Sequence, residues 1–373
     1  MIMKYLLIPL LVLLLFTTAC QNNEEVQPDT PSPTTSTDST LYFPPINSNT
    51  WETTSPESLG WNTQAISSLE SYLANSNTKA FILLKNGKIV IEKYFGQNLN
   101  NQTFSAISNW YWASAGKTLT AFVVGKAQEE NLLNINDKSS KYLGTGWTSL
   151  SAAQEDQITV KNQLTMTAGL NDAGTNRDCT DPSCLTYLAN PSTRWAYHNA
   201  PYTRLDGVIE GASGMTFSNY FNTRLRDKIG MNGFWQKLGF NNVYFSTPRS
   251  MARFGLLILN KGKWDDETIL ADESYYNAMI TPSQDINKSY GYLWWLNGQS
   301  SFMLPTLQAV FPGSISPNAP AEMICAIGKN GQLINIIPSQ NMVVIRMGDN
   351  PDESLVPTNF QDELWAKIKE VIQ

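Results

Sequence analysis

Apolar and β-branched residues flank an Asn86-Gly87 dipeptide in the segment KAFILLKNGKIVIEKYF, residues 79–95. Two such runs joined by Asn-Gly predict a β-hairpin, because both turn positions need a positive φ. A second apolar run, EMICAIGKNGQLINIIPSQNMVVIRMG, occupies residues 322–348. It predicts two or three antiparallel strands with a turn at Pro338-Ser339. Strands therefore lie at both ends of the domain, and any fold must bring them together.

Helical patterns fill the region between the predicted strands. Apolar residues recur at helical spacing after Ser114, and Gly125 in that helix indicates close packing against a neighbour. We also expect a short helix over 158–170 closed by Gly169, mostly helices and loops over 180–280, a strand in YGYLWWLNG (290–298) and an amphipathic helix over 359–373. The predicted fold class is α+β: a central antiparallel sheet flanked by helices, with an inserted, mostly helical lobe. The groove between the lobes is the natural place for a site.

The N-terminus has the pattern of an export signal. Lys4 precedes an apolar run over residues 5–16 and then Thr17-Thr18-Ala19-Cys20. We expect a signal peptide over residues 1–19, and the run is shorter than the roughly 20 apolar residues of a membrane span. A small residue before Cys20 resembles a bacterial lipoprotein lipobox, with Thr17 where leucine is usual. The resemblance implies lipidation of Cys20 and a protein anchored to a bacterial membrane, periplasmic or at the cell surface; plain secretion is the alternative.

Residues 20–49 are rich in Pro, Thr, Ser, Asp and Asn. Such a segment buries too little apolar surface to offset its ordering entropy, so we expect a flexible tether. The folded domain is then predicted over residues 50–373, and we expect a monomer that contacts the membrane only through its lipid.

Three cysteines follow Cys20. Cys179 and Cys184 are five residues apart in DCTDPSC, and in an oxidising compartment they would form a small-loop disulfide; two free thiols are the alternative. Cys325, in an apolar run, is expected to be a buried small hydrophobe.

Composition narrows the chemistry. The net charge is −6 and no basic stretch stands out, so a nucleic-acid partner is not expected. The chain has one histidine, so any Ser-His-Asp triad must use His198, and no Gly-x-Ser-x-Gly motif occurs. Histidine and cysteine form no ligand cluster, so neither a metal nor any other cofactor is expected.

Ser114 and Lys117, in WASAGKTLTAF, offer a nucleophile and a base instead. Their i, i+3 spacing places both side chains on one helix face. Lysine is a useful base only where burial or another cation lowers its pKa. The alternative is a serine that merely begins a helix. A second Ser-x-x-Lys, Ser76 to Lys79, lies in a polar loop and is interpreted as a chance match.

The motifs together resemble the serine β-lactamase-related family: class C β-lactamases, penicillin-binding peptidases and their esterase and amidase relatives. That family carries Ser-x-x-Lys, Tyr-x-Asn and Lys/His-Thr/Ser-Gly in this order. Here they are SAGK (Ser114), YHN (Tyr197) and KNG (Lys329), and the resemblance spans about residues 55–349. Tyr-x-Asn also occurs at Tyr220 and Tyr275, and Lys-Asn-Gly also at Lys85.

The resemblance implies a role for each matched residue. Ser114 would be acylated, and Lys117 and Tyr197 would move its proton. Asn199 would orient Lys117 and the substrate amide. Lys329, with Gly331 after it, would add positive field, and the N–H groups of Ser114 and Gln332 would form an oxyanion hole.

Asn330 departs from the family's Thr or Ser. The departure removes a hydroxyl near the substrate carboxylate in β-lactamases, which favours a small ester or amide as substrate. The alternatives are a β-lactamase or D-alanyl-D-alanine carboxypeptidase acting on peptidoglycan-like substrates, and a penicillin-binding sensor without turnover.

Overall fold

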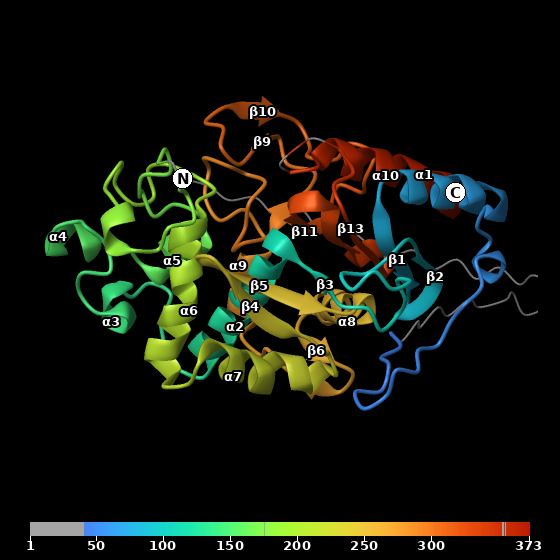
Figure 1. Ribbon diagram of the computed structural model, residues 1–373, viewed down its shortest axis with the longest axis horizontal. Helices are drawn as coiled ribbons and strands as arrows, with labels where there is room; N and C mark the ends of the chain where they lie inside the picture. Colours follow the sequence, from blue (N-terminus) through green and yellow to red (C-terminus); the bar gives the residue numbers. More distant parts are fainter. Residues whose placement is uncertain (1–40, 175, 353, 355) are drawn as a thin grey trace, which may run out of the picture. The chain divides into compact units, whose positions relative to one another are not determined.

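A six-stranded antiparallel sheet lies at the centre of the fold. In this computed structural model, which describes residues 41–174, 176–352, 354 and 356–373, the strand order is β2-β1-β13-β12-β11-β8 (Figure 1). The strands are β1 (Thr78–Lys85), β2 (Lys88–Tyr94), β8 (Trp295–Leu296), β11 (Ile324–Gly328), β12 (Gln332–Ile337) and β13 (Met342–Gly348). Because β1 pairs with β13, both ends of the domain form one sheet, as the sequence predicts.

The β1–β2 turn has the predicted Asn86-Gly87 geometry, with φ of 51° and 80°. The turn is also covered by the segment before the first strand. Tyr42 N–H donates to the Asn86 carbonyl at 3.0 Å, and the Trp51 indole donates to the Gly87 carbonyl at 2.8 Å. The hairpin is thus fixed on both sides of its turn.

The domain begins earlier than the predicted residue 50. The buried Arg253 guanidinium donates to the carbonyl oxygens of Pro45 at 2.8 Å and Ser48 at 3.0 Å. Residues 41–49 therefore pack against the domain, and the prediction of a tether through residue 49 is wrong for this part. The predicted signal peptide, the lipidated Cys20 and the tether up to residue 40 lie outside the described residues.

Helices cover both faces of the sheet. On one face, α8 (Pro248–Leu259) packs with Gly255 against Val343 and Ile334. The opposite face is covered by α10 (Thr358–Ile372), whose Gln361 amide lies 3.7 Å from the Cys325 sulfur. Helix α1 (Ile66–Asn75) lies beside α10 (Figure 1). The predicted C-terminal helix and the burial of Cys325 are confirmed.

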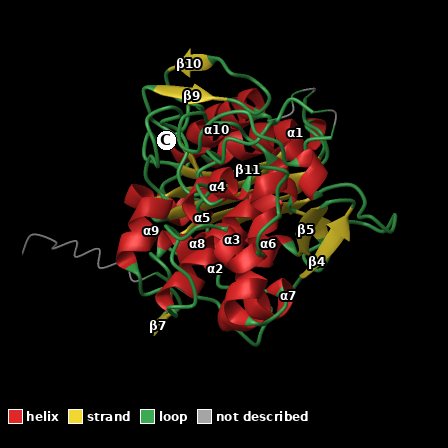
Figure 2. Cartoon of the chain, turned by 90° about the vertical axis from the view of Figure 1, so that its left-hand side faces the viewer, coloured by secondary structure: helices red, strands yellow, loops and turns green. Residues whose placement is uncertain are grey.

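The inserted lobe is built around two helices, α2 (Lys117–Glu129) and α6 (Asn199–Ser213), which contact each other. Figure 2 shows α3, α5 and the β4–β5 hairpin near α6. The remaining elements of this region are α3 (Ser140–Leu143), α4 (Ala152–Glu155), α5 (Val160–Leu164), α7 (Phe217–Phe221), α9 (Glu273–Met279), β3 (Trp110–Tyr111), β4 (Phe234–Leu238) and β5 (Asn241–Ser246). Short two-stranded pairs are β6 (Lys263–Trp264) with β7 (Glu267–Thr268) and β9 (Ser301–Met303) with β10 (Val310–Pro312).

Three local predictions differ from the structure. The helix expected over 158–170 ends at Leu164, and Gly169, with φ of 74°, lies beyond its end. The β4–β5 hairpin lies in the region expected to be helical. The expected strand 290–298 is reduced to Trp295–Leu296. In the described residues, no helix has both the length and the apolar character needed to cross a membrane.

Gly125 supplies a test of the packing between α2 and α9. A Cβ at Gly125 would collide with the ring of Tyr275, which is buried and whose hydroxyl donates to the Ala121 carbonyl at 2.7 Å. We predict that Gly125→Ala lowers the free energy of unfolding by about 2 kcal/mol, although alanine normally favours a helix. Urea unfolding would measure the change.

Gly207→Ala is the matched control, because Gly207 also lies inside a helix but faces only the Leu143 side-chain terminus, 2.9 Å from a Cβ placed there. A flexible methyl group can move, so this variant should lose less than about 1 kcal/mol. Equal stability of the wild type and Gly125→Ala would contradict the packing argument.

Candidate active site

Ser114 and Lys117 meet at the start of α2. Ser114 lies in a 3-10 turn, Ala113–Gly116, and Lys117 is the first residue of the helix that continues from it. The Lys117 Nζ donates to the Ser114 Oγ at 2.9 Å. Trp112, directly before the turn, connects it to β5, because its indole donates to the Ser246 hydroxyl at 2.8 Å. The predicted pair is therefore held in hydrogen-bonding contact by a buried frame.

The Lys117 amine lies in an aromatic pocket. Its side chain is 4% exposed, and Nζ lies 4.4 Å from the ring centre of Tyr202 and 5.0 Å from that of Tyr197. Burial lowers the pKa of Lys117 to about 7, and the negative charge of Asp178 opposes this by raising it. Near neutral pH a large fraction of Lys117 is consequently an uncharged amine, which can accept a proton.

Tyr197 immediately precedes α6 and faces the same pair. Burial raises the pKa of Tyr197 above its usual value, and a hydrogen bond with the Ser114 hydroxyl lowers it in part. Its ring stacks on Trp295 with centroids 5.9 Å apart and packs edge-on against Tyr290 at 6.2 Å. The phenol is thus neutral at ordinary pH and fixed beside Ser114, where it can relay a proton.

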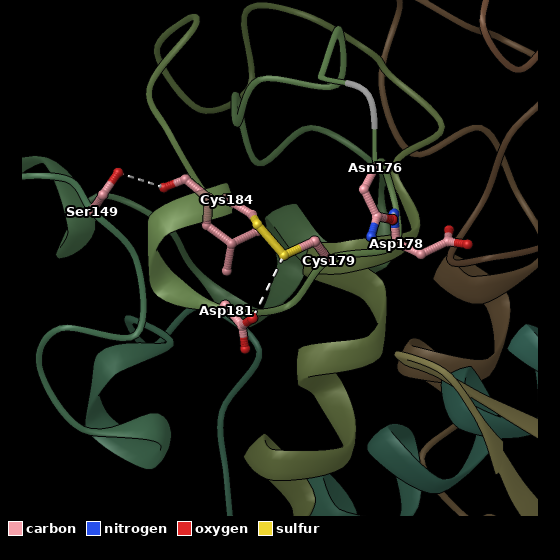
Figure 3. The surroundings of a disulfide bond; sticks show 7 residues. Ser149, Asn176, Asp178, Cys179, Asp181 and Cys184 are labelled. Carbon is pink, nitrogen blue, oxygen red and sulfur yellow. Dashed lines mark hydrogen bonds between the residues drawn. A yellow bond between two sulfur atoms is a disulfide. The ribbon is translucent and has the colours of Figure 1, made fainter.

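Asn199, the first residue of α6, does not contact Lys117 through any hydrogen bond in the described structure. Its Nδ2 donates instead to Asp178 Oδ1 at 2.7 Å. Asp178 was not predicted from the sequence. The only sequence signal that could have found it is its position directly before Cys179, which forms a disulfide with Cys184, the pairing that the sequence favours (Figure 3).

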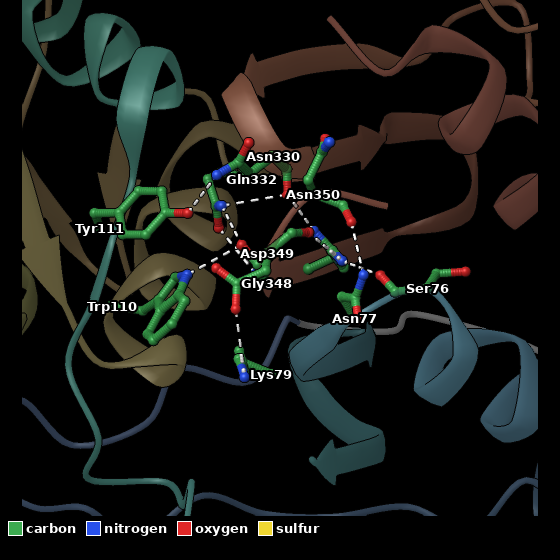
Figure 4. A network of polar contacts seen from close by, with 11 residues as sticks. Ser76, Asn77, Lys79, Trp110, Tyr111, Asn330, Gln332, Gly348, Asp349 and Asn350 are labelled. Carbon is green, nitrogen blue, oxygen red and sulfur yellow. Dashed lines mark hydrogen bonds and ion pairs between the residues drawn. The ribbon is translucent and has the colours of Figure 1, made fainter. Parts of the chain in front are cut away.

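The Lys329-Asn330-Gly331 segment forms the tight turn between β11 and β12. Asn330 has a φ of 65°, and its Nδ2 donates to the Tyr111 hydroxyl at 2.7 Å (Figure 4). Gly331 has a φ of 71°, and a Cβ there would lie 2.6 Å from the Arg346 guanidinium. Lys329 is exposed and lines the cavity at Ser114. The Asn330 amide is therefore hydrogen-bonded to Tyr111 rather than free for a substrate.

A buried arginine fixes this turn. Arg346 on β13 is fully buried and donates to the carbonyl oxygens of Asn330 and Gly331 on one side and of Ser76 on the other. Burial lowers the pKa of Arg346 to about 9. The carbonyl oxygens accept the guanidinium hydrogen bonds that a carboxylate would otherwise accept. Through these bonds Arg346 connects the turn to the end of α1.

The Gln332 N–H was predicted as the second donor of the oxyanion hole, but Gln332 is not among the residues that line the cavity at Ser114. Gln332 is the first residue of β12, and its side chain forms two hydrogen bonds with the backbone of Gly348, at 2.6 and 3.1 Å (Figure 4). Gly328 lies against the serine turn instead. A Cβ there would be 2.6 Å from the Trp112 carbonyl oxygen and 3.1 Å from the Ser114 nitrogen. Gly328, three residues before the predicted Gly331, is thus the glycine next to Ser114.

A cavity of about 550 Å³ joins the predicted residues. Five of the seven predicted catalytic and orienting residues line it, and Gly331 and Gln332 are not in the described lining. The lining residues are Ala113, Ser114, Lys117, Gly174, Asn176, Arg177, Asp178, Tyr197, Asn199, Tyr202, Asn241, Asn242, Val243, Pro305, Thr306, Ile327, Lys329 and Val356.

His198 lies outside this cavity. It is buried in a small separate space with Gln163 and Met166, and burial lowers its pKa to about 4. Its neutral ring does not line the cavity at Ser114, so a triad that uses His198 is not supported. Within the described residues no group of three or more His, Cys, Asp or Glu could hold a metal ion.

The Beta-lactamase family model matches residues 74–353, about three quarters of the chain. An uncharacterized protein of Alkalihalophilus pseudofirmus is 21% identical over 310 residues, which cover 74% of this chain and 85% of that protein. Penicillin-binding protein 4* of Bacillus subtilis is 26% identical over 136 residues, 32% of this chain and 29% of that protein.

Solved structures agree in fold. A putative 6-aminohexanoate-dimer hydrolase from Bacillus anthracis aligns with a TM-score of 0.61 and 18% identity, over 82% of this chain and 83% of that one. A putative beta-lactamase from Bacteroides dorei aligns with a TM-score of 0.64 and 17% identity, over 84% and 99%. The predicted β-lactamase/transpeptidase-like α+β fold is confirmed.

Burial of Lys117 should make the free energy of unfolding depend on pH. An unfolded lysine has a pKa of 10.5 and the folded Lys117 of about 7, so between these values the unfolded chain binds more protons. The cost of burying this amine therefore grows as the pH falls from 10.5 and is complete below about 7. We predict that Lys117→Met stabilises the protein more at pH 6 than at pH 9, by on the order of 2 kcal/mol.

Urea unfolding at both pH values measures this difference. Lys126→Met is the matched control, because Lys126 lies on the same helix and pairs with Glu129 at 2.5 Å near the surface. Its effect should differ less between the two pH values. A Lys117→Met effect that is the same at pH 6 and pH 9 would show that the amine keeps an ordinary pKa.

Proposed function

The chain belongs to the Beta-lactamase family, and on that premise we propose that it is a serine hydrolase that cleaves a small ester or amide through an acyl-enzyme on Ser114. The observation that carries the proposal is the 2.9 Å contact between Lys117 Nζ and Ser114 Oγ, together with the burial that lowers the lysine pKa to about 7. A serine next to an amine that is partly uncharged at neutral pH is an activated nucleophile.

In the proposed acylation, Ser114 Oγ attacks the substrate carbonyl carbon while the neutral Lys117 amine accepts the hydroxyl proton. A bond between Oγ and carbon forms, and the bond from that carbon to the leaving oxygen or nitrogen then breaks. Tyr197 lines the same cavity as Ser114, is hydrogen-bonded to this serine and has a raised pKa, so it is suited to pass the proton from Lys117 to the leaving group. In deacylation, water attacks the acyl carbon while Lys117 accepts one of its protons. The bond from that carbon to Ser114 Oγ then breaks, and the proton passes to Oγ, which releases the acid.

The developing oxyanion needs two N–H donors. Ser114 N–H is the first, as the sequence predicts. For the second we propose Lys329 N–H in place of Gln332, because Gly328 is the residue of β11 that lies against the serine turn. Arg346 donates to the carbonyl oxygens of Asn330 and Gly331, and these hydrogen bonds fix the turn that begins with Lys329. Loss of one such donor typically costs about 2.7–4 kcal/mol of transition-state stabilisation.

An ester or amide is favoured over a β-lactam by the state of Asn330. The Asn330 amide donates to Tyr111 and is not free to bind a substrate carboxylate. The residue before Gly328, Ile327, lines the cavity and brings no hydroxyl to it. A structurally similar protein is named a putative 6-aminohexanoate-dimer hydrolase, and its name is compatible with this choice.

The first test is hydrolysis of p-nitrophenyl butyrate by Ser114→Ala. We expect kcat/KM to fall by at least about 10³-fold, because the covalent step is lost. Ser76→Ala is the matched control. Ser76 begins the second Ser-x-x-Lys, but its hydroxyl only donates to the Tyr72 carbonyl at 2.8 Å, so activity should be retained.

Intact mass spectrometry after mixing with the ester or with a penicillin then identifies what acylates Ser114. A transient adduct with the ester and none with penicillin supports the proposal. Rapid nitrocefin turnover would move the assignment to a β-lactamase, and a lasting penicillin adduct without turnover would move it to a sensor. An inactive wild type that no fluorophosphonate probe labels would overturn the serine hydrolase.

The pH profile is the second test. Because Lys117 must be neutral to accept a proton, kcat/KM should fall about tenfold per pH unit below about 7 and level off above it. Steady-state kinetics between pH 5 and 9 would show the bend. A profile that is flat across this range would mean that Lys117 is not the base.

A further inference from the structure

Asp178 reaches the active site from a loop that no family motif covers. Its Oδ1 accepts the Asn199 amide hydrogen bond at 2.7 Å, and its side chain lines the cavity that contains Ser114 and Lys117. Asn199 is two residues from Tyr197 and begins α6. Asp178 is therefore connected to the polypeptide that carries the proposed proton relay.

The loop is fixed at several points around Asp178 (Figure 3). Cys179, the next residue, is buried and bonded to Cys184, and the Ala200 N–H donates to the Arg177 carbonyl at 3.3 Å. The other end of the disulfide loop is attached to the lobe, because the backbone and hydroxyl of Ser149 both donate to the Leu185 carbonyl, at 3.1 and 3.2 Å. The covalent bond thus limits where the Asp178 carboxylate can lie.

Asp178 is also the negative charge that acts on the buried amine. The groups that face Lys117 are the Ser114 hydroxyl and the rings of Tyr197 and Tyr202, all neutral at ordinary pH. Arg177 and Lys329 line the same cavity, and the charge of Asp206 acts on Tyr202. Of these charged groups, Asp178 raises the pKa of Lys117, against the larger lowering by burial.

We propose that Asp178 is a positioning residue of this active site, which orients Asn199 and sets the field at Lys117, and that the Cys179–Cys184 disulfide holds it there. The proposal rests on the proposed hydrolase function. The Asp178 carboxylate contributes both a hydrogen bond to Asn199 and a negative charge near Lys117. Two substitutions distinguish these contributions.

Asp178→Asn keeps an oxygen that can accept from Asn199 but removes the charge. The acid limb of kcat/KM should shift to lower pH by at least about 0.5 unit, with the plateau nearly unchanged. Asp178→Ala removes both, so the limb should shift likewise and the plateau should fall roughly tenfold as Asn199 loses its partner. A residue with a merely structural role would lower activity without moving the limb.

Asp181→Asn is the matched control, because it removes the same charge from the same loop at an exposed position outside the described cavity lining. It should leave both the limb and the plateau at wild-type values. The proposal is overturned if Asp178→Asn has the wild-type limb, if Asp181→Asn shifts the limb equally, or if Asp178→Ala keeps the wild-type plateau.

The disulfide is tested by the double variant Cys179→Ser/Cys184→Ser. Freed from its bond, the loop should release Asp178, so the variant should resemble Asp178→Ala in both limb and plateau. Cys325→Ser is the control, since Cys325 is a buried free thiol under α10. A double variant with the wild-type profile would overturn the part assigned to the disulfide.

A readout without substrate keeps the two proposals distinguishable. In protein labelled with ¹³C-lysine, the Cε signal of Lys117, assigned by its loss in Lys117→Met, reports its titration between pH 5 and 10. The midpoint should fall in Asp178→Asn and Asp178→Ala and stay in Asp181→Asn. If no ester is hydrolysed yet the midpoint falls, the hydrolase proposal fails and the link from Asp178 to Lys117 stands; an unmoved midpoint overturns that link.

Discussion

The geometry of the active site depends on the burial of one lysine amine against one serine. Lys117 has a single hydrogen-bond acceptor in the described structure, the Ser114 hydroxyl, and two tyrosine rings in place of water. An ammonium group gains little solvation there, so burial shifts the equilibrium toward the neutral amine. This requires rigid walls, because a mobile wall would admit water. Tyr197 is accordingly stacked on Trp295 and packed against Tyr290.

A second buried basic group, Arg346, meets the cost of burying a charge in the opposite way, by keeping its charge and binding carbonyl oxygens. It has backbone carbonyl oxygens on both sides as acceptors, and its pKa of about 9 leaves it charged at neutral pH. The charge holds the β11–β12 turn against the end of α1 and so fixes the peptide next to Gly328. One buried cation loses its proton to provide a base, whereas the other keeps its charge to fix the backbone beside the serine.

Local signals in the sequence predicted the features that depend on local physics. Asn86-Gly87 requires a tight turn, and the Ser114–Lys117 spacing requires one helix face, so both were predictable. The β4–β5 hairpin was not, because its first strand is mostly exposed and lacks the alternation that marks a strand. The Lys-Asn-Gly match predicted residue types but not the backbone conformation. Asn330 has a φ of 65°, so the segment is a turn. Gly328 therefore lies next to Ser114, where Gly331 was expected. Asp178 was missed because its role arises from a fold contact with Asn199.

The substrate-facing part of the cavity comes from connections rather than from the core. The serine turn, α2 and β11 are fixed by buried contacts, whereas other parts of the cavity wall come from Gly174, residues 176–178, the start of β5 and residues 305–306. Even there the wall is partly anchored: Asp206, whose pKa burial raises to about 7, accepts from the Asn242 amide at 3.0 Å. Connections tolerate substitution where a packed core does not, so the same nucleophile and base can be presented to different acyl groups by exchanging these segments. A disulfide in such a connection restricts the loop, so that Asp178 stays where its charge acts on the Lys117 amine.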